Sequence, residues 1–147
     1  MRLALGSDTN GSTRVPVSLG GAFGLKPTFD RRARRGSFPF VASIDHLGPF
    51  ARSVEDLAAS DAAMKGADAL DRGRHATRVR PVLPRLQRGA DGLRIGALGC
   101  YFKGNAESGA LPAVTAVTAL LIGGQVIAAP RREALALRVA RATLTEL

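Results

Sequence analysis

The chain has 147 residues, the length of one domain, and a compact domain of that size buries about 68–70% of the surface that its unfolded chain exposes. Apolar residues make up 46% of it but aromatic residues only 5%, so a globular core with few large side chains is expected. The net charge of +9 is compatible with nucleic-acid binding, yet no aromatic residues are interleaved with the basic ones for base stacking, which makes that class unfavoured.

The remaining composition bears on location and cofactors. A single cysteine, Cys100, excludes an intrachain disulfide, and no stretch approaches the ~18 uninterrupted apolar residues of a membrane span. Met1 is not followed by a signal-peptide pattern, so the cytoplasm is the simplest location. The pair Gly21 and Gly24 lacks the first glycine and the βαβ context of a dinucleotide fingerprint. We expect no cofactor, no metal site and no membrane partner.

Residues 6–16 are the first informative stretch, directly after a short apolar run at residues 2–5 that predicts the end of a buried strand. Two glycines, an Asn and several hydroxyls around a single Asp predict a tight loop with free backbone N–H groups. Ser12 lies in its middle. A hydroxyl among convergent N–H donors suits acyl transfer, because the serine attacks a carbonyl and the donors hold the oxyanion. The alternative is an ordinary surface turn.

Short elements follow this loop. We expect a helix start within residues 15–24, broken by a Gly-Gly pair, and a brief strand at residues 24–27. Residues 38–41 and 47–50 are apolar and punctuated by proline, so they predict irregular segments that line one side of the site. Their phenylalanines are expected in a substrate pocket or, as the favoured interpretation, in the core: Phe38, Phe40 and Phe50.

The clearest helix begins after Ser53, where a capping residue precedes Glu55 and Asp56 in the first turn, and it closes at Gly66. Residues 67–92 are rich in Arg, Asp, Gly and Pro and predict a long surface connection. An α/β alternation is expected beyond it, with a strand at 93–98, a helix at 108–122, a strand at 125–129 and a helix at 131–147.

Three blocks in this order and spacing closely resemble the amidase signature family, serine hydrolases that cleave C–N bonds of amides. The blocks are residues 6–16, 20–28 and 38–53. Two segments, DTNGS at residues 8–12 and SFPFVAS at residues 37–43, are most similar to the subgroup around 1-carboxybiuret hydrolase, which acts on small ureido compounds. The family also includes the A subunit of the glutamyl-tRNA amidotransferase, so an amidotransferase fragment is an alternative.

The resemblance implies part of an α/β fold, a mixed sheet covered by helices on both faces, incomplete in this chain. It assigns residues 1–66 to the nucleophile-bearing half of the amidase signature core, residues 67–92 to the surface connection, and residues 93–147 to an α/β continuation of the same domain. A small amide would be the substrate of the full-length enzyme. A small partner subunit or a homo-oligomer is a further expectation.

The resemblance places the nucleophile on Ser12 and the oxyanion hole on the backbone N–H groups of Thr9, Asn10, Gly11 and Ser12 itself. Three positions depart from the family pattern, namely Asn10, Thr13 and Val17. Family members activate the serine with a cis serine and a lysine, both upstream of the nucleophile. No such segment is present, and the chain's lysines stand in other contexts: Lys26, Lys65 and Lys103. We therefore expect a fragment truncated at both ends and inactive alone.

Two alternatives remain. Asp45 and His46 permit a Ser-His-Asp hydrolase, but adjacent residues rarely point at each other, so a structural role in the turn before Gly48 is favoured. The second alternative is a non-catalytic α/β remnant that serves as an interaction module. This alternative is favoured because the lysine that activates the serine in the family is missing from the sequence.

Overall fold

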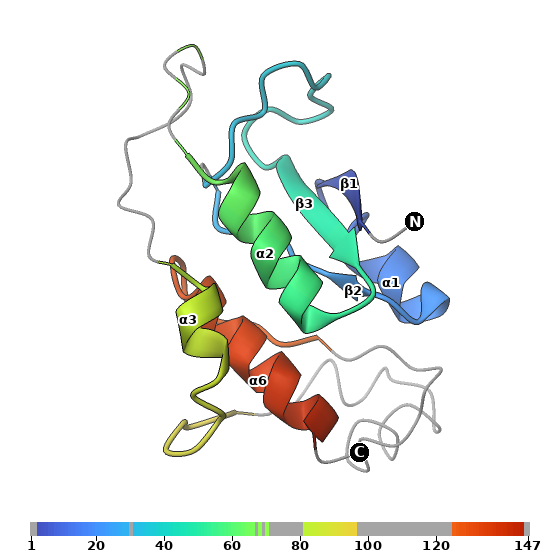
Figure 1. Cartoon of the computed structure of the whole chain (residues 1–147). Helices are drawn as coiled ribbons and strands as arrows, with labels where there is room; N and C mark the ends of the chain where they lie inside the picture. Colours follow the sequence, from blue (N-terminus) through green and yellow to red (C-terminus); the bar gives the residue numbers. More distant parts are fainter. Residues whose placement is uncertain are drawn as a thin grey trace.

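The computed structural model describes residues 3–29, 31–66, 68, 70, 81–96 and 125–145. In chain order its elements are β1 (Leu3–Asp8), α1 (Arg14–Gly20), β2 (Phe23–Gly24), β3 (His46–Ala51), α2 (Val54–Met64), α3 (Leu83–Leu86) and α6 (Glu133–Thr145). Figure 1 shows α2 alongside the strands and α3 with α6 beyond one end of it. The described part is an α/β arrangement built on one small sheet.

The sheet has three antiparallel strands in the order β1-β3-β2. In the register, Leu3 lies opposite Ala51 and Asp8 lies opposite His46, so β1 delivers Asp8 beside the start of β3. The expectation of an irregular segment at residues 47–50 is therefore wrong, because these residues belong to the central strand. Proline within a strand hides the pattern from sequence reasoning, since it removes one ladder donor and is rare in central strands.

Gly48 lies in β3 where this strand contacts the loop after β1, and there is no room for a side chain at this position. A Cβ added there would lie 2.3 Å from the carbonyl oxygen of Leu25 and 3.1 Å from Cγ2 of Thr13. Only glycine allows the strand to approach these two segments so closely. The neighbouring carbonyl of Pro49 accepts a hydrogen bond from the Leu25 N–H at 3.2 Å. The central strand is thus packed directly against the loop that holds Ser12 and Thr13.

Several predicted elements are confirmed. The strand before residue 6 and the short helix after it are present, and the brief strand is there but lies at Phe23–Gly24. The expected burial of the first strand is wrong, because Leu3 and Leu5 are exposed. Ser53 caps α2 as predicted, with its hydroxyl oxygen accepting a hydrogen bond from the Asp56 N–H at 3.0 Å. The last helix is α6, which begins at Glu133. Strong local signals, a capping serine and glycine breaks, located these elements.

Two strands expected in the second half are not formed by the described residues. Residues 125–129 and the described part of the strand expected at 93–98 form no strand, while the helix expected at 108–122 lies outside the described residues. The surface connection expected at 67–92 contains α3, whose flanking Val82 and whose Leu86 are buried in the core. These two apolar residues are four positions apart, which places them on one helical face.

The core consists of small and medium apolar side chains from α2, β3 and the two helices that pack on α2. Its buried members in the described residues are Leu25, Ala51, Val54, Leu57, Ala58, Val82, Leu86 and Leu137. The favoured core position of Phe38 and Phe40 is wrong, because these side chains are 97% and 84% exposed. They project from the loop before β3, where no described element covers them.

Buried ion pairs connect the elements of this core, which has few aromatic side chains. Asp61 on α2 is fully buried and accepts hydrogen bonds from Nη2 of Arg31 at 2.8 Å and Nη2 of Arg32 at 2.7 Å. Burial raises the pKa of Asp61, but the two guanidinium groups outweigh it and hold the pKa below its usual value. Arg31 also pairs with Glu133 of α6 at 3.1 Å. This network joins α2, the loop after β2 and α6.

We predict that Asp61→Asn lowers the free energy of unfolding by about 3–5 kcal/mol, because it leaves two buried guanidinium groups without their shared carboxylate. Asp56→Asn on the same helix is the matched control, since Asp56 forms no ion pair within the described part of the chain. Urea denaturation measures both. Equal, small losses in the two variants would contradict a central role for the network.

Candidate active site

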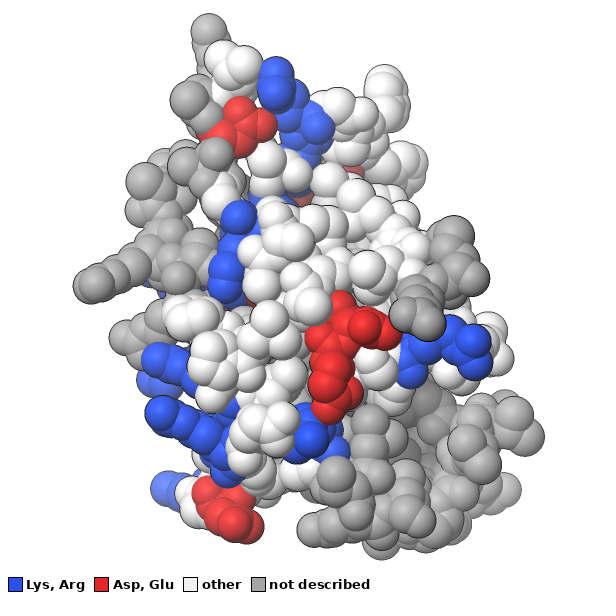
Figure 2. All heavy atoms as spheres, viewed as in Figure 1, with Lys and Arg blue, Asp and Glu red and all other residues white. Residues whose placement is uncertain are grey.

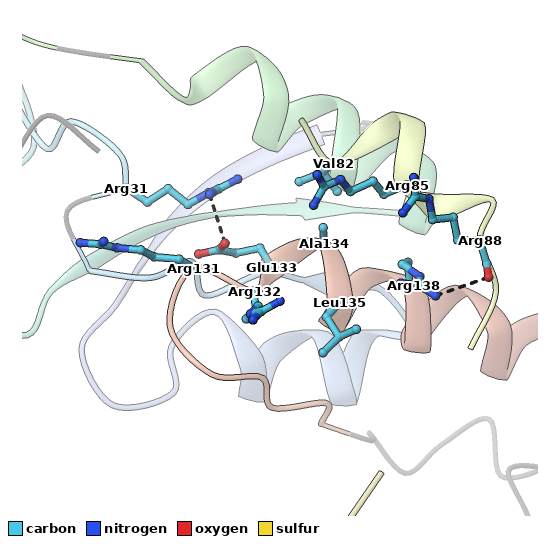
Figure 3. A pocket seen from close by; sticks show the side chains of 10 residues that line it. All are labelled: Arg31, Val82, Arg85, Arg88, Arg131, Arg132, Glu133, Ala134, Leu135 and Arg138. Carbon is cyan, nitrogen blue, oxygen red and sulfur yellow. Dashed lines mark hydrogen bonds and ion pairs between the residues drawn. The ribbon is translucent and has the colours of Figure 1, made fainter. Parts of the chain in front are cut away.

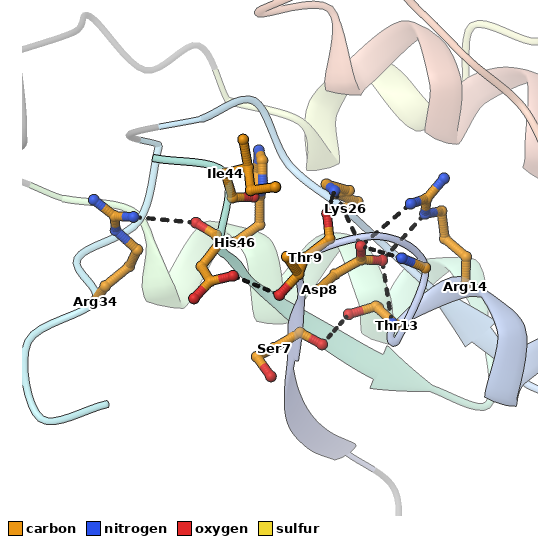
Figure 4. Close-up of polar contacts among 11 residues, drawn as sticks. Ser7, Asp8, Thr9, Thr13, Arg14, Lys26, Arg34, Ile44 and His46 are labelled. Carbon is orange, nitrogen blue, oxygen red and sulfur yellow. Dashed lines mark hydrogen bonds and ion pairs between the residues drawn. The ribbon is translucent and has the colours of Figure 1, made fainter. Parts of the chain in front are cut away.

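Asp8 is the residue around which the loop at residues 9–13 closes. Its side chain ends β1, is fully buried, and accepts hydrogen bonds from both backbone and side chains (Figure 4). The donors are the Gly11 N–H at 2.8 Å, the Thr13 N–H at 3.1 Å, Arg14 Nε at 3.1 Å, Arg14 Nη2 at 3.2 Å and Lys26 Nζ at 3.0 Å. One carboxylate thus fixes the whole turn between β1 and α1.

The electrostatics of Asp8 keep this anchor charged. Burial by itself raises the pKa of its carboxyl group, but the hydrogen bonds from Arg14, Lys26, Gly11 and Thr13 outweigh burial and hold the pKa well below the usual range. Asp8 is therefore ionised in the folded chain at neutral pH. It is a fixed negative charge rather than a proton donor or acceptor.

Ser12 lies at the outer side of the loop and is exposed, whereas its neighbours Gly11 and Thr13 are buried. Gly11 has a φ of 132°, a backbone conformation that favours glycine, and its carbonyl accepts the N–H groups of Arg14 and Val15, both at 2.8 Å. The loop therefore turns sharply at Gly11 and starts α1 directly afterwards. This turn leaves the Ser12 side chain accessible at the start of the helix.

The residues expected to form the oxyanion hole lie together in this turn. Gly11 directs its N–H toward the Asp8 carboxylate. The Thr9 carbonyl accepts a hydrogen bond from Lys26 Nζ at 3.1 Å, which fixes the first peptide of the turn, and Asn10 is exposed near Ser12. The roles of Thr9, Asn10, Gly11 and Ser12 in holding an oxyanion stay predictions.

Asp45 connects this turn to the loop before β3. It accepts a short hydrogen bond from the Thr9 hydroxyl and further bonds from the N–H groups of Phe40 at 2.6 Å and Val41 at 2.8 Å. The Thr9 hydroxyl is the main cause that lowers the pKa of Asp45, with the two N–H groups adding to it. Asp45 is thus a carboxylate that braces two loops.

His46 takes no part in a catalytic pair with Asp45. Its Nδ1 lies 2.7 Å from the Ile44 carbonyl oxygen, and its ring packs edge-on against Phe29 with centroids 5.4 Å apart. Burial lowers its pKa. The hydrogen bonds of Asp45 go instead to Thr9 and to the loop backbone. This arrangement favours the structural interpretation of the Asp45-His46 pair over a Ser-His-Asp hydrolase.

Sequence reasoning missed the anchoring role of Asp8 and the reach of Asp45 to the nucleophile loop. A signal for Asp8 was available, because an Asp at the end of a strand, followed by Asn and Gly and then by a basic residue, is typical of a turn closed on a carboxylate. Lys26 helps to fix this loop through its contacts with Asp8 and with the Thr9 carbonyl. The Thr9–Asp45 contact spans 36 positions and leaves no local pattern.

Two negative observations concern the described residues alone. They contain no group of three or more His, Cys, Asp and Glu side chains placed to hold a metal ion. None of their helices combines the length and the apolar character that crossing a membrane requires.

Comparison with known proteins places this geometry in a family. The family model described as Amidase matches residues 1–136. AtzE, the 1-carboxybiuret hydrolase subunit of Pseudomonas sp. (strain ADP), is 54% identical over 131 residues, which are 89% of this chain and 29% of that protein. The A subunit of the glutamyl-tRNA(Gln) amidotransferase of Rubrobacter xylanophilus is 44% identical over 93 residues, which are 63% of this chain and 19% of that protein.

A solved structure agrees with these relatives. It is described as a vestigial protein complex that reveals the evolutionary origins of an s-triazine catabolic enzyme, and it matches with a TM-score of 0.76 at 54% identity. The match covers 86% of this chain and 28% of that one. The chain belongs to the amidase family, and it spans less than a third of the length of the relatives it matches. The resemblance drawn from the three sequence blocks is confirmed.

We predict that Asp8→Asn lowers the free energy of unfolding at pH 7 by about 1–3 kcal/mol, because the charged acceptor of several hydrogen bonds is lost. The pKa of Asp8 is lower in the folded chain than in the unfolded one. Its contribution is therefore fully present above the unfolded pKa of about 3.9 and is lost as the pH falls below it.

Urea denaturation between pH 7 and pH 3 measures this effect, with Asp91→Asn as a control at an exposed carboxylate. The difference between wild type and Asp8→Asn should be constant near neutral pH and shrink in acid. A difference that does not change with pH would show that the charge of Asp8 is not what anchors the loop.

Proposed function

We propose that the chain carries the nucleophile of a serine amidase that hydrolyses the C–N bond of small amides or ureido compounds. The observation that carries the proposal is the loop closed on Asp8, which leaves Ser12 exposed at the start of α1 in a chain of the amidase family. In this proposal residues 1–66 are the nucleophile-bearing half of the core, and residues 93–147 continue the same domain.

The proposed reaction has two steps. The Ser12 Oγ attacks the amide carbonyl, the C–N bond breaks, and the amine or ammonia leaves with a proton while an ester forms on Ser12. Water then attacks this ester, and the acid is released as Ser12 regains its proton. Backbone N–H groups of Thr9, Asn10 and Ser12 would face the oxyanion in both steps, whereas the Gly11 N–H is already held by the Asp8 carboxylate at 2.8 Å.

Activation of Ser12 requires a base. A serine alcohol is a weak nucleophile at neutral pH, and the base that the family resemblance implies is a lysine assisted by a cis serine. Lys26, which is part of the same site, is held by Asp8 and by the Thr9 carbonyl. We therefore expect these 147 residues by themselves to be inactive and the activity to need the lysine and cis serine from other residues.

The substrate and partner are proposed from the relatives. AtzE is named for 1-carboxybiuret hydrolysis, and the Rubrobacter protein is named for an amidotransferase. The higher identity and coverage of AtzE favour a small ureido substrate over an amidotransferase reaction. Both relatives are named as subunits, which supports a partner subunit for the complete protein.

A fusion tests the proposal. The parts of AtzE that flank the matched region are joined to the two ends of this chain, and ammonia release from amides and ureido compounds is followed. Ser12→Ala should lower the rate by at least about a thousandfold, because it removes the attacking atom. Ser7→Ala, which changes an exposed serine on the preceding strand, should leave the rate within about twofold, since this serine is not among the proposed site residues.

Circular dichroism spectra of all fusions are recorded first, and only folded fusions are compared. Full activity of the folded Ser12→Ala fusion would rule out the acyl-enzyme on Ser12. Turnover by the chain alone would contradict the need for an external base. A folded fusion that shows no turnover but binds a partner protein would favour the non-catalytic interaction module.

A further inference from the structure

A hollow lined by arginines lies between α3 and the start of α6, away from the residues of the candidate active site. Its volume is about 90 Å³. Figure 3 shows that the side chains come from the loop after β2, from α3 with the turn that follows it, and from α6 with the residues before it. The lining residues are Arg31, Val82, Arg85, Arg88, Arg131, Arg132, Glu133, Ala134, Leu135 and Arg138.

The charges in this hollow do not balance. Glu133 is its one carboxylate, and it is already engaged by Arg31 at 3.1 Å and by the Thr28 N–H at 3.0 Å. Arg31 in turn pairs with Asp61. The hollow has five further arginines, and none of them lies within 4.0 Å of a carboxylate among the described residues. They are Arg85, Arg88, Arg131, Arg132 and Arg138. These positive charges therefore line a small space without a counter-charge among the described residues.

The backbone holds the guanidinium group of Arg138, and the chain at Arg131 is also fixed. Arg131 has a φ of 65°, which costs energy for any residue other than glycine, and its N–H donates to the Thr28 hydroxyl at 2.7 Å. Arg138 donates from Nε to the Gly89 carbonyl at 2.9 Å. The first contact fixes the residues before α6, and the second fixes α6 to the turn after α3. A donor that is fixed before binding loses less entropy when a ligand enters, and this applies to Arg138.

Figure 2 shows Lys and Arg side chains gathered over the region where Figure 1 draws α3. Repulsion among like charges in such a cluster is relieved when a polyvalent anion binds. Guanidinium groups pair in a bidentate manner with phosphate oxygens. A monocarboxylate would neutralise one cation, whereas a phosphate or diphosphate group neutralises two or more. The small volume fits a compact group, and the apolar Val82, Ala134 and Leu135 close part of its wall.

We propose that this hollow binds the phosphate or diphosphate group of a small molecule, a site independent of the amidase reaction. Isothermal titration at low ionic strength with inorganic pyrophosphate tests it on the full chain, and inorganic phosphate and adenosine diphosphate serve as further arms. Tighter binding of pyrophosphate than of phosphate is expected. Adenosine diphosphate distinguishes a free diphosphate from one carried by a nucleotide, because only the second gains affinity from the nucleoside.

The Arg85→Gln, Arg132→Gln double variant should raise the Kd for pyrophosphate at least about tenfold, since two charged donors are removed. The matched control is Arg52→Gln, Arg94→Gln, which removes two exposed arginines outside the hollow and should change the Kd less than about twofold, because neither side chain lines the hollow. Arg131→Gly is a second variant. It removes a cation at a position whose backbone favours glycine, so it should weaken binding without loss of stability.

Three results would overturn the proposal. The first is that the wild-type chain shows no saturable binding of pyrophosphate. The second is that the hollow and control variants weaken pyrophosphate binding equally. The third is that the chain binds an RNA oligonucleotide or an acidic peptide but not pyrophosphate. Urea midpoints of the variants establish that each is folded when it is titrated.

Discussion

The carboxylate of Asp8 is the interaction on which the rest of the candidate active site depends. It sits at the point where β1 ends, and two backbone N–H groups and two cationic side chains converge on it. A buried charge is stable only when it is paired and hydrogen-bonded, so the surrounding turn is forced into one conformation. That conformation places Ser12 outside the turn and starts α1. The position of the proposed nucleophile is therefore a consequence of burying a charge.

A second buried carboxylate, Asp61, fixes the packing of the helices through ion pairs, as Asp8 fixes the loop. It gathers Arg31 and Arg32, and Arg31 carries the connection on to Glu133 at the start of α6. Ion pairs have directional geometry, unlike contacts among small apolar side chains. A chain whose described core consists of Leu, Val and Ala thus fixes the orientation of α2 and α6 through charges.

Sequence reasoning found the features that depend on local signals. The loop with Ser12, the cap at Ser53 and the helix after Arg131 each follow from residues within a few positions of one another. Sequence reasoning missed β3, because Gly48 and Pro49 interrupt the alternation of apolar and polar residues that is typical of a strand. Gly48 is required by its close approach to Leu25 and Thr13, which are distant in sequence. The Thr9–Asp45 and Arg31–Asp61 contacts join residues far apart in the chain, and such pairs leave no local pattern. The strand expected at 125–129 failed for a different reason: an apolar run forms a strand only beside a neighbouring strand, and none of the described strands pairs with it.

The central claim is that the loop anchored by Asp8 presents Ser12 as the nucleophile of an amidase. Covalent labelling with a serine-directed fluorophosphonate, followed by peptide mapping of the fusion that supplies the missing base, tests this claim most directly. The account predicts a label on Ser12 that is strongly reduced in a folded Asp8→Asn fusion. A label on another serine, or one on Ser12 that does not depend on Asp8, would contradict it.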